Sequence, residues 1–457
     1  MIRNDHVFVR AGVLSIIVAF SSAVPAVAQN WSFDARAIAM GGVGGTGNLS
    51  TKMIDEQRSY TAIVLPFGLF QVFQDMSIYD PNSRNFDPVR IMEYAAGPLH
   101  YVVDRGQTNT GEALFVSDIR NATLSRDLSR YRGFVPANDL LAEGLAAPNF
   151  GGTIKVHKGS GGGFQGVYIG AGPYLSVHDA GTFSPALTGV LSTGVNVANA
   201  VMSISNADEG QIALAVTGGY RGRFAWGEGI GSGSAREGLY VAANYNYLHG
   251  FQYEADVMAI TLHTNSAGLI DISPIAVNNS TIGINHRHAT DGRGFSIDAG
   301  VGAVIDRWEV GFGANGIGNR IDWTGVQQTV YSLLNLTSGN SNFGTSATTA
   351  APDARVELPI DYRGNVAYRA DNWSAMAEAG HGFGGGSFHA GLEKRFGRIE
   401  LRGGARYTFS KWNPTGGLGF DLSRRISFDV AAYGTNANIE RTRRTAIAAS
   451  IRFNHFK

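Results

Sequence analysis

The chain has 457 residues, a formal net charge of zero and no cysteine. The lack of cysteine excludes disulfides and thiolate metal sites, and the balanced charge without a long basic tract argues against nucleic-acid binding. Glycine is abundant, with 61 residues against 13 prolines, but 44% of the residues are apolar, so the composition indicates an ordered chain rather than a disordered one.

The first 28 residues have the pattern of a secretory signal peptide. A basic start ("MIRNDHVFVR") is followed by a short apolar run ("AGVLSIIVAF") and by a small-x-small cleavage site that ends at Ala28. The apolar run is too short to span a bilayer as a helix, and no later segment approaches about 20 consecutive apolar residues. We therefore predict a signal peptide over 1–28, an N-terminal hatch or plug segment over 29–57 and a large domain over 58–457.

The next segment, "FDARAIAMGGVGGTGN" (Phe33–Asn48), consists mostly of small residues. Its "GVGGTG" matches the G-x-G-x-x-G fingerprint of dinucleotide-binding proteins, but that fingerprint requires a preceding strand and a βαβ unit, and here a cleavage site precedes it. Because glycine is costly to order, such a segment gains most by packing into a ready-made cavity. The residues expected to matter in this packing are Asp34, Arg36, Gly41, Gly42 and Gly44.

Apolar and polar residues alternate along many later segments. In "IELRGGARYTF" (Ile399–Phe409) one set of alternate positions is apolar, and the other carries Glu400, Arg402 and Arg406. Since successive side chains of a strand point to opposite faces, this pattern predicts a strand with one apolar and one charged face. The alternation recurs in "GFQGVYIGAGPYLSV", "EGLYVAANYNY", "GFSIDAGVGAVI", "ISFDVAAYG" and "AIAASIRF".

Two architectures fit such strands: a soluble sandwich with its apolar faces inward, or a membrane barrel with its apolar face toward lipid. The connections favour the barrel. Toward the C-terminus, short turns ("DR", "DN", "GR", "SRR") alternate with longer loops ("GFGGG", "SKWNPTG", "TNANIERTRR"). This is typical of outer-membrane barrels, whose short turns are periplasmic. We predict an all-β fold, a transmembrane antiparallel β-barrel of about 14–16 strands, closed over Gly163–Phe453, with the hatch inside.

The pattern is weaker toward the N-terminus. We count about 14 strands of nine to twelve residues from Gly163 onward, and "GPLHYVVDR", "GEALFVSDI" and "GGTIKVHK" add two to four more. The segment 264–280 then becomes a long connection on the side where turns should be short. Two segments, Ser184–Ile204 and Val326–Leu336, have helical spacing; such helices act as lids over a barrel mouth or as lipid-contacting collars, or they pack as ordinary loops.

Charged residues recur on the polar faces of the predicted strands. On a lipid face an arginine near the midplane would cost about 2–4 kcal/mol, so these side chains should point into the lumen while Leu401 and Tyr407 face lipid. Charges of both signs on neighbouring strands favour a ladder of ion pairs over a solute-selecting constriction. The residues predicted to face the lumen are Glu309, Arg363, Arg369, Glu393, Glu400, Arg402, Arg406, Asp429 and Arg452.

Motifs for catalysis are missing from the sequence. His286 and His288 share one strand face, but Zn²⁺ usually needs three or four ligands, and their parity continues that of Ile282 and Ile284, which places them at the lipid interface. There is no G-x-S-x-G elbow and no H-E-x-x-H helix. We predict no catalytic residue, no metal site and no cofactor, with an outer-membrane phospholipase as the remaining enzymatic alternative.

The opening "FDARAIAMGGVGGTGN" resembles the DAR-x-x-x-MGG-x-G opening of barrels related to the long-chain fatty-acid transporters of the outer membrane. Similar openings occur in a group named after a conjugal-transfer protein, and "ELPIDYRGNVAY" and "GRGFSIDAGV" resemble internal strands of that group. In the transporters this segment folds into the barrel as a hatch and helps to hold the ligand. The resemblance implies a hatch over Asp34–Asn48, and none of the transporters' ligand residues has a matching motif here.

The end of the last predicted strand, Phe453, is similar to the C-terminal aromatic by which outer-membrane barrels are recognised for insertion; Phe456 is the alternative, although it breaks the strand's parity. We thus expect a barrel in the bacterial outer membrane that acts as a passive transporter or channel for small, partly hydrophobic molecules. Its expected partners are outer-membrane lipid, a small-molecule solute and the barrel assembly machinery. The alternative is a non-transporting barrel, either an adaptor for secretion or surface attachment or a structural protein.

Overall fold

The computed structural model describes residues 34–43, 48–56, 60–65, 67, 100–103, 110–136, 138–147, 150–227, 230–232, 234–271, 280–334, 336–337, 339, 344–382, 385–408, 411–435 and 443–454. The predicted signal peptide, Gly44 and Phe456 lie outside the described residues. None of the described helices is both long and apolar enough to cross a membrane.

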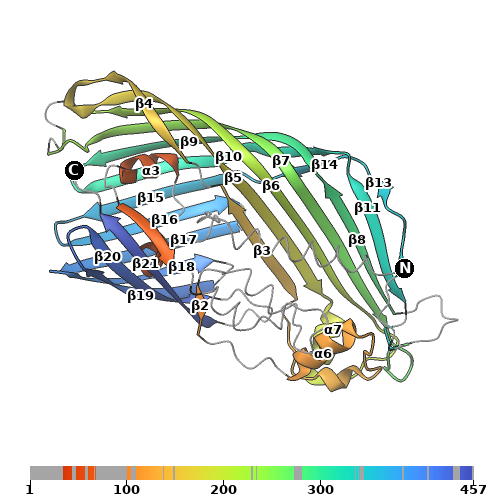
Figure 1. The fold of residues 1–457 in the computed structure, drawn as a ribbon. Helices are drawn as coiled ribbons and strands as arrows, with labels where there is room; N and C mark the ends of the chain where they lie inside the picture. The colour runs from red at the N-terminus through yellow and green to blue at the C-terminus, as the bar shows by residue number, and fades with distance from the viewer. Residues whose placement is uncertain are drawn as a thin grey trace.

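The described chain is mostly β-strand, with a few short helices (Figure 1). The helices are α2 (Ala35–Ala39), α3 (Leu49–Glu56), α6 (Thr110–Arg120) and α7 (Pro185–Thr193), with 3-10 turns η2 (Leu128–Tyr131) and η3 (Ser160–Gly162). The strands are β1 (Tyr60–Leu65), β2 (Tyr101–Val102), β3 (Asp139–Ala146), β4 (Phe150–Lys158), β5 (Phe164–Phe183), β6 (Val201–Phe224), β7 (Gly238–His263), β8 (Thr281–Ala289), β9 (Asp291–Ile305), β10 (Trp308–Thr324), β11 (Gln327–Leu334), β12 (Gly344–Thr345), β13 (Thr349–Ala350), β14 (Ala354–Glu357), β15 (Asp361–Arg369), β16 (Trp373–Gly382), β17 (Gly385–Phe396), β18 (Ile399–Thr408), β19 (Lys411–Asp421), β20 (Ile426–Thr435) and β21 (Arg444–Asn454).

The described strands form one antiparallel sheet in which several short strands continue one another. β1 and β2 both pair with β21, β3 and β4 with β5, and β8 and β9 with β7. β10 and β11 continue each other in the same way, as do β12 to β15. Once these pieces are joined, the described strands make 14 crossings, which lies within the predicted range.

The first crossing pairs with the last, because β1 lies against β21 from Tyr60 opposite Asn454 to Leu65 opposite Ala449. The sheet therefore begins well before Gly163, where the closed barrel was predicted to start. Figure 1 shows the strands curving around α3, which lies near the ends that carry the short turns. In the described part of the chain β3 and β4 pair with β5 alone, so closure on that side stays a prediction.

The prediction of strand lengths was wrong for the first half of the sheet. β5, β6 and β7 have 20, 24 and 26 residues instead of nine to twelve. Because β7 is a single strand, twelve crossings rather than 14 follow Gly163 in the described residues. The connection 264–280 between β7 and β8 therefore lies at the end of the sheet that carries the long loops. Alternation cannot reveal that one strand continues through Gly250, since the extra residue of a β-bulge at Phe251 shifts its parity.

Four local predictions can be compared directly with the structure. "GGTIKVHK" forms β4 as predicted; the helix predicted over Ser184–Ile204 is present only in its first half, as α7, because Val201–Ile204 already belong to β6. "GEALFVSDI" was predicted as a strand and belongs to α6, a run rich in the helix formers Glu, Ala and Leu. Val326–Leu336 was predicted as a helix, but it is mostly β11, because its β-branched and aromatic residues pair with β8.

Along the strands the charged residues are buried and the apolar residues are exposed, which is the reverse of a soluble sandwich. On β18, Leu401 is 52% exposed, whereas Glu400 and Arg402 are 0% and 3% exposed. We call the face that carries Glu400 and Arg402 the inner face, since α2 lies against it, and the face that carries Leu401 the outer face. A soluble sheet with these exposures would leave its apolar residues in water, which excludes the sandwich.

The pairing of the first and last crossings can be tested by cross-linking, because the natural chain has no cysteine. Ile63 lies directly opposite Ile451, so an Ile63→Cys, Ile451→Cys double variant should form a disulfide on mild oxidation, read as a cross-linked peptide pair by mass spectrometry. In the control, Ile63→Cys with Ser450→Cys, the two side chains point to opposite faces and should stay reduced. Equal cross-linking of both pairs would contradict the register.

Candidate functional site

The sequence of the N-terminal segment explains the short helix α2. Asp34 caps its start, since the Asp34 carboxylate accepts a hydrogen bond from the backbone N–H of Arg36 at 3.2 Å. Gly41 and Gly42 have φ of +80° and +85°, in the left-handed region that glycine enters without strain. The consecutive glycines therefore end the helix after one turn and direct the chain away.

The inner face beneath α2 consists of small residues. Gly391 of β17 lies directly opposite Gly404 of β18. A Cβ at Gly391 would lie 2.3 Å from the backbone oxygen of Met40, and one at Gly404 would lie 2.6 Å from the nitrogen of Gly41. Only glycine allows the backbone of the segment to approach the sheet this closely. The alanines packed together beside this contact are Ala35, Ala39, Ala431, Ala446 and Ala448.

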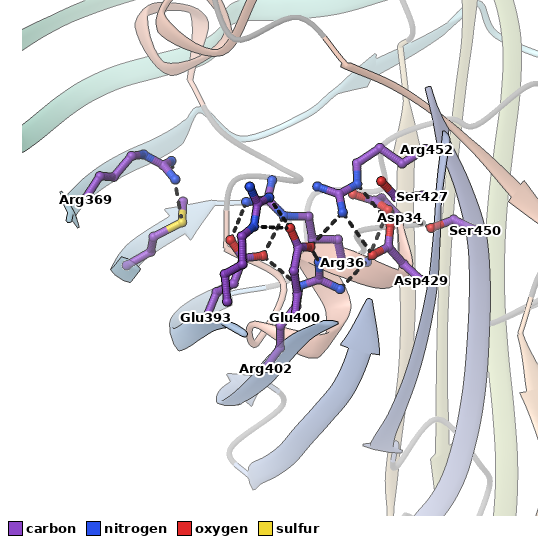
Figure 2. A network of polar contacts seen from close by, with 12 residues as sticks. Asp34, Arg36, Arg369, Glu393, Glu400, Arg402, Ser427, Asp429, Ser450 and Arg452 are labelled. Carbon is purple, nitrogen blue, oxygen red and sulfur yellow. Dashed lines mark hydrogen bonds and ion pairs between the residues drawn. The ribbon is translucent and has the colours of Figure 1, made fainter. Parts of the chain in front are cut away.

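On one side of this small-residue seat, Arg36 connects α2 to a group of buried charges (Figure 2). Its guanidinium donates two hydrogen bonds to Glu393, with N–O distances of 2.8 and 2.9 Å. Glu393 also accepts from Arg402 Nε at 2.7 Å, so one carboxylate bridges the helix and the sheet. Such bidentate, charge-assisted contacts fix geometry as well as charge.

Arg402 is the centre of this group. It contacts three carboxylates, Glu393, Glu400 and Asp429, the last at 2.7 Å from Nη1. Arg452 contacts two of the same carboxylates, Glu400 at 2.7 Å and Asp429 at 3.3 Å. Every buried charge thus has an opposite charge beside it, which is the condition for keeping charges away from water.

The group is formally neutral, with four cations and four carboxylates. Asp34 adjoins it: its carboxylate accepts a hydrogen bond from Ser450 Oγ at 2.9 Å and lies near enough to interact with Asp429. Arg395 also contacts Glu400 but is half exposed. The members of this ion-pair cluster are Asp34, Arg36, Glu393, Arg395, Glu400, Arg402, Asp429 and Arg452.

On the other side of the seat, a row of polar residues crosses four strands. Glu378, His389, Arg406 and Asn413 are direct cross-strand partners on β16 to β19. His389 is fully buried, and its Nδ1 donates to the backbone oxygen of Gly41 at 2.6 Å. The N-terminal segment is therefore held on both sides of the seat. His389 bonds the backbone of Gly41 on one side, and the ion-pair cluster holds Arg36 on the other.

Two side contacts keep the polar row rigid. Arg363 donates to Asp361 at 2.6 Å and to Glu378 at 2.9 Å, and all three side chains are buried. Arg406 stacks over the Tyr433 ring at 4.6 Å and donates to a backbone oxygen at 3.2 Å. The charged residues of the row, Glu378 and Arg406, therefore already interact with residues of the sheet itself.

The second helix, α3, sits on a different part of the inner face and uses neutral contacts. Asn48 caps its N-terminus, accepting from the backbone N–H groups of Ser50 and Thr51 at 3.0 and 3.1 Å. The side-chain oxygen of Asn365 on β15 accepts hydrogen bonds from Asn48 at 3.2 Å and from Thr51 at 2.7 Å. Ser50 Oγ donates to the backbone oxygen of Val301 at 2.9 Å. α3 was not predicted from the sequence, although an asparagine at the position of Asn48 is a helix N-cap signal.

The structure brings most of the residues singled out from the sequence to one place. Glu309 and Arg369 lie apart: Glu309 bridges Arg369 and Arg236 at 3.0 Å each. Those grouped around α2 on the inner face are Asp34, Arg36, Gly41, Gly42, Arg363, Glu393, Glu400, Arg402, Arg406, Asp429 and Arg452. Arg236 was missed because it lies in the connection before β7.

The two neighbouring histidines do not form a metal site with their surroundings. His286 Nδ1 lies 2.8 Å from Asp256 of β7, and the rings of His286 and His288 stack at 5.6 Å. Among the described residues, no group of three or more metal-ligating side chains is suitably placed. Their predicted location at a lipid interface stays a prediction.

These features define the class of the protein: a large antiparallel β-barrel sheet with an apolar outer face, a charged inner face and an N-terminal segment packed within. No family model and no curated protein matches the chain.

Among solved structures, the chain is similar to the Ralstonia pickettii toluene transporter TbuX, with 10% identity over 70% of this chain and 88% of that chain and a TM-score of 0.34. It is similar to the Pseudomonas putida toluene transporter TodX, with 11% identity over 70% and 88% and a TM-score of 0.32. A Pseudomonas aeruginosa FadL homologue gives 11% identity over 78% and 99% and a TM-score of 0.33. Similarity at this level does not identify a substrate.

The glycine seat predicts that a single methyl group displaces α2. In Gly391→Ala the new Cβ would meet only backbone atoms of Met40, so α2 should leave the wall and expose the bond after Arg36 to trypsin. Gly403→Ala is the control, since nothing lies within 4 Å of a Cβ there. Cleavage would be followed by mass spectrometry of the folded protein, and equal protection of both variants would contradict the close approach.

The ion-pair cluster predicts unequal effects of two arginine substitutions. Arg402→Gln removes the cation that pairs with Glu393, Glu400 and Asp429. It should lower the free energy of unfolding by about 3–5 kcal/mol. Arg36→Gln should cost about 1–2 kcal/mol, because Glu393 keeps Arg402. Urea unfolding in detergent micelles measures both, and equal losses would show that Arg402 is not the centre of the cluster.

Proposed function

We propose that the protein is an outer-membrane β-barrel that lets small molecules cross passively, with residues 34–56 as a hatch in its lumen. The observation that carries the proposal is the seat of α2, a short helix packed beside paired charges on the inner face of a sheet whose outer face is apolar. On this view the inner face lines the lumen, residues 58–457 form the barrel, and the short turns are periplasmic.

The outer face supports a membrane location. Trp308, Tyr368 and Trp373 cluster beside the short turns, with ring centroids 4.9 and 5.1 Å apart. A second aromatic cluster lies toward the long loops and consists of Phe388, Tyr407 and Trp412. Along β17, Phe388 and Phe396 are eight residues apart, which corresponds to about 26 Å of strand. Two aromatic clusters bordering an apolar band of about 25 Å are typical of outer-membrane barrels.

The contacts of α2 support a role as a hatch rather than as a fixed part of the wall. The helix has five residues, and its buried apolar side chains are Ala35, Ile38 and Ala39. Burying the largest of these contributes about 1.5–3 kcal/mol, so the helix can leave without unfolding the sheet. The wall keeps its own ion pairs when α2 leaves, because Arg395, Arg402 and Arg452 still balance Glu393, Glu400 and Asp429.

The inner face also suggests the kind of solute. Toward the long loops it carries an apolar, partly aromatic group with two polar handles: Trp323 Nε1 donates to Gln211 at 3.1 Å, and the Tyr253 hydroxyl donates to Glu209 at 3.2 Å. The largest members of this group are Tyr174, Leu248, Tyr253, Ile321 and Trp323. These side chains are only 0–3% exposed and pack on one another, so a solute would meet them only where this packing opens; apolar and aromatic side chains at that level suit a small, partly hydrophobic molecule better than an ion. We therefore propose transport without covalent chemistry.

Insertion of the barrel is expected to depend on its last strand. β21 is paired on both sides, with β20 and with β1, and Phe453 lies opposite Ile426 and Thr61. We propose that this strand and its aromatic end are what the barrel assembly machinery recognises.

Deletion of the hatch should open the lumen. Without Asp34–Val43 the barrel should still insert, because the strands pair without this segment, and its single-channel conductance in planar bilayers should rise severalfold. A control deletes residues 436–442 from the predicted long loop "TNANIERTRR" and leaves the hatch intact. Unchanged conductance of the hatch deletion would contradict the hatch and favour the alternative, a sealed adaptor or structural barrel.

A further inference from the structure

The long strands β5, β6 and β7 bury apolar residues on both faces. Near the short turns, odd-numbered residues of β6 lie on the inner face: Arg221 is directly opposite Ala242 of β7, which packs with α3. β6 is one uninterrupted strand and pairs with β5 from Arg223 to Ile204 without a register shift. Met202 and Ile204 are even-numbered, so their buried side chains lie on the outer face.

The elements that cover these outer-face residues come from the loops. Met202 and Ile204 belong to an apolar cluster with residues of α6, η2 and α7, including the fully buried Leu128, Leu187 and Leu191. We call residues 110–136 together with 185–197 the collar. Because the collar packs on the outer face, it lies beside the wall rather than over the mouth of the barrel, which distinguishes a collar from a lid.

The same outer face changes character along β6. Leu214, Val216 and Tyr220 are exposed apolar residues that continue the proposed lipid-facing band. Asn206 and Asp208 follow on the same face and are half-buried. The order along the outer face is therefore an apolar band, a short polar band and then the collar, so the collar lies past the end of the apolar band, on the side of the lipid headgroups.

The exposed surface of the collar combines arginine with apolar side chains. Arg126, Arg130 and Arg132 are exposed on and beside η2. Val195 and Val197 are 65% and 44% exposed just after α7. The two groups adjoin, since a Cβ at Gly194 would lie 2.9 Å from Cδ of Arg132.

The carboxylates beside these arginines are already engaged. Asp118 accepts from the Tyr131 hydroxyl at 2.7 Å and lies 3.9 Å from Arg130. Asp127 accepts from Asn196 at 2.6 Å, and hydrogen bonds from Ser129 and Asn196 lower the pKa of Asp127. Its contact with Asn196 ties the valine segment to η2, so the arginines and valines form one surface.

We propose that the collar binds the phosphate groups of outer-leaflet lipids, with Arg126, Arg130 and Arg132 on the phosphates and Val195 and Val197 in the interface. Guanidinium groups pair with phosphate oxygens bidentately, and exposed arginines next to apolar side chains are typical of surfaces that lie in a membrane interface. This inference rests on the proposed membrane barrel and adds a lipid-binding surface to it.

The test uses single cysteines in the natural cysteine-free chain, each labelled with a polarity-sensitive fluorophore in vesicles of phosphatidylcholine with or without phosphatidate. Probes on Val195→Cys and Val197→Cys should emit at shorter wavelength with phosphatidate than without it. The matched control is Val257→Cys, because Val257 is 52% exposed on the inner face at the same level of the sheet. Its probe should report water in both vesicles.

Two further variants separate the explanations. Adding Arg130→Gln and Arg132→Gln should abolish the phosphatidate-dependent shift at position 195, and a shift that persists would overturn the role of the arginines. Identical water-like emission at 195 and 257 with phosphatidate would overturn the collar itself. Leu401→Cys reports on the barrel: if its probe is in lipid while that at 195 is in water, only the collar fails, whereas water at both positions contradicts the membrane barrel.

Discussion

The constraint on which the rest of the structure depends is the placement of charge on the concealed face of the sheet. Within the apolar band of the outer face, a strand can carry ionisable residues only on its inner face, where those of the ion-pair cluster are mostly buried. Each charge must then find an opposite charge on a neighbouring strand or on the inserted segment. Arg402 meets this requirement for three carboxylates at once, and Arg36 brings a matching charge from outside the sheet.

Charge alone does not hold the N-terminal segment. Ion pairs determine where α2 lies along the wall, but the close approach depends on Gly391 and Gly404, which leave room for its backbone. α3 uses a different solution, with the neutral side chains of Asn48 and Thr51 on Asn365. The two helices of the proposed hatch therefore differ in how they are held: α2 through the ion pair of Arg36, and the start of α3 through the neutral side chains of Asn48 and Thr51.

The strands beyond the proposed membrane band serve a second purpose. In β5 to β7 the inner face carries the cluster around Trp323, while the outer face carries the cluster beneath α7. One sheet can do this because its two faces are independent, and because strands of 20–26 residues extend well past the length that a bilayer requires. A surface that would otherwise be exposed to water becomes the support for the collar.

The sequence by itself determined the fold class, because alternation is a local property: in "IELRGGARYTF" the residues that share a face follow from their spacing. It also marked "ARAIAMGG" as a segment for tight packing, since small residues and paired glycines limit what it can form. It did not determine the lengths of β5 to β7, the helix α6 or the strand β11, because partners distant in the sequence decide these. Which arginine meets which carboxylate, and which face of β6 the collar covers, depend on register between strands, and register exists only in the tertiary structure.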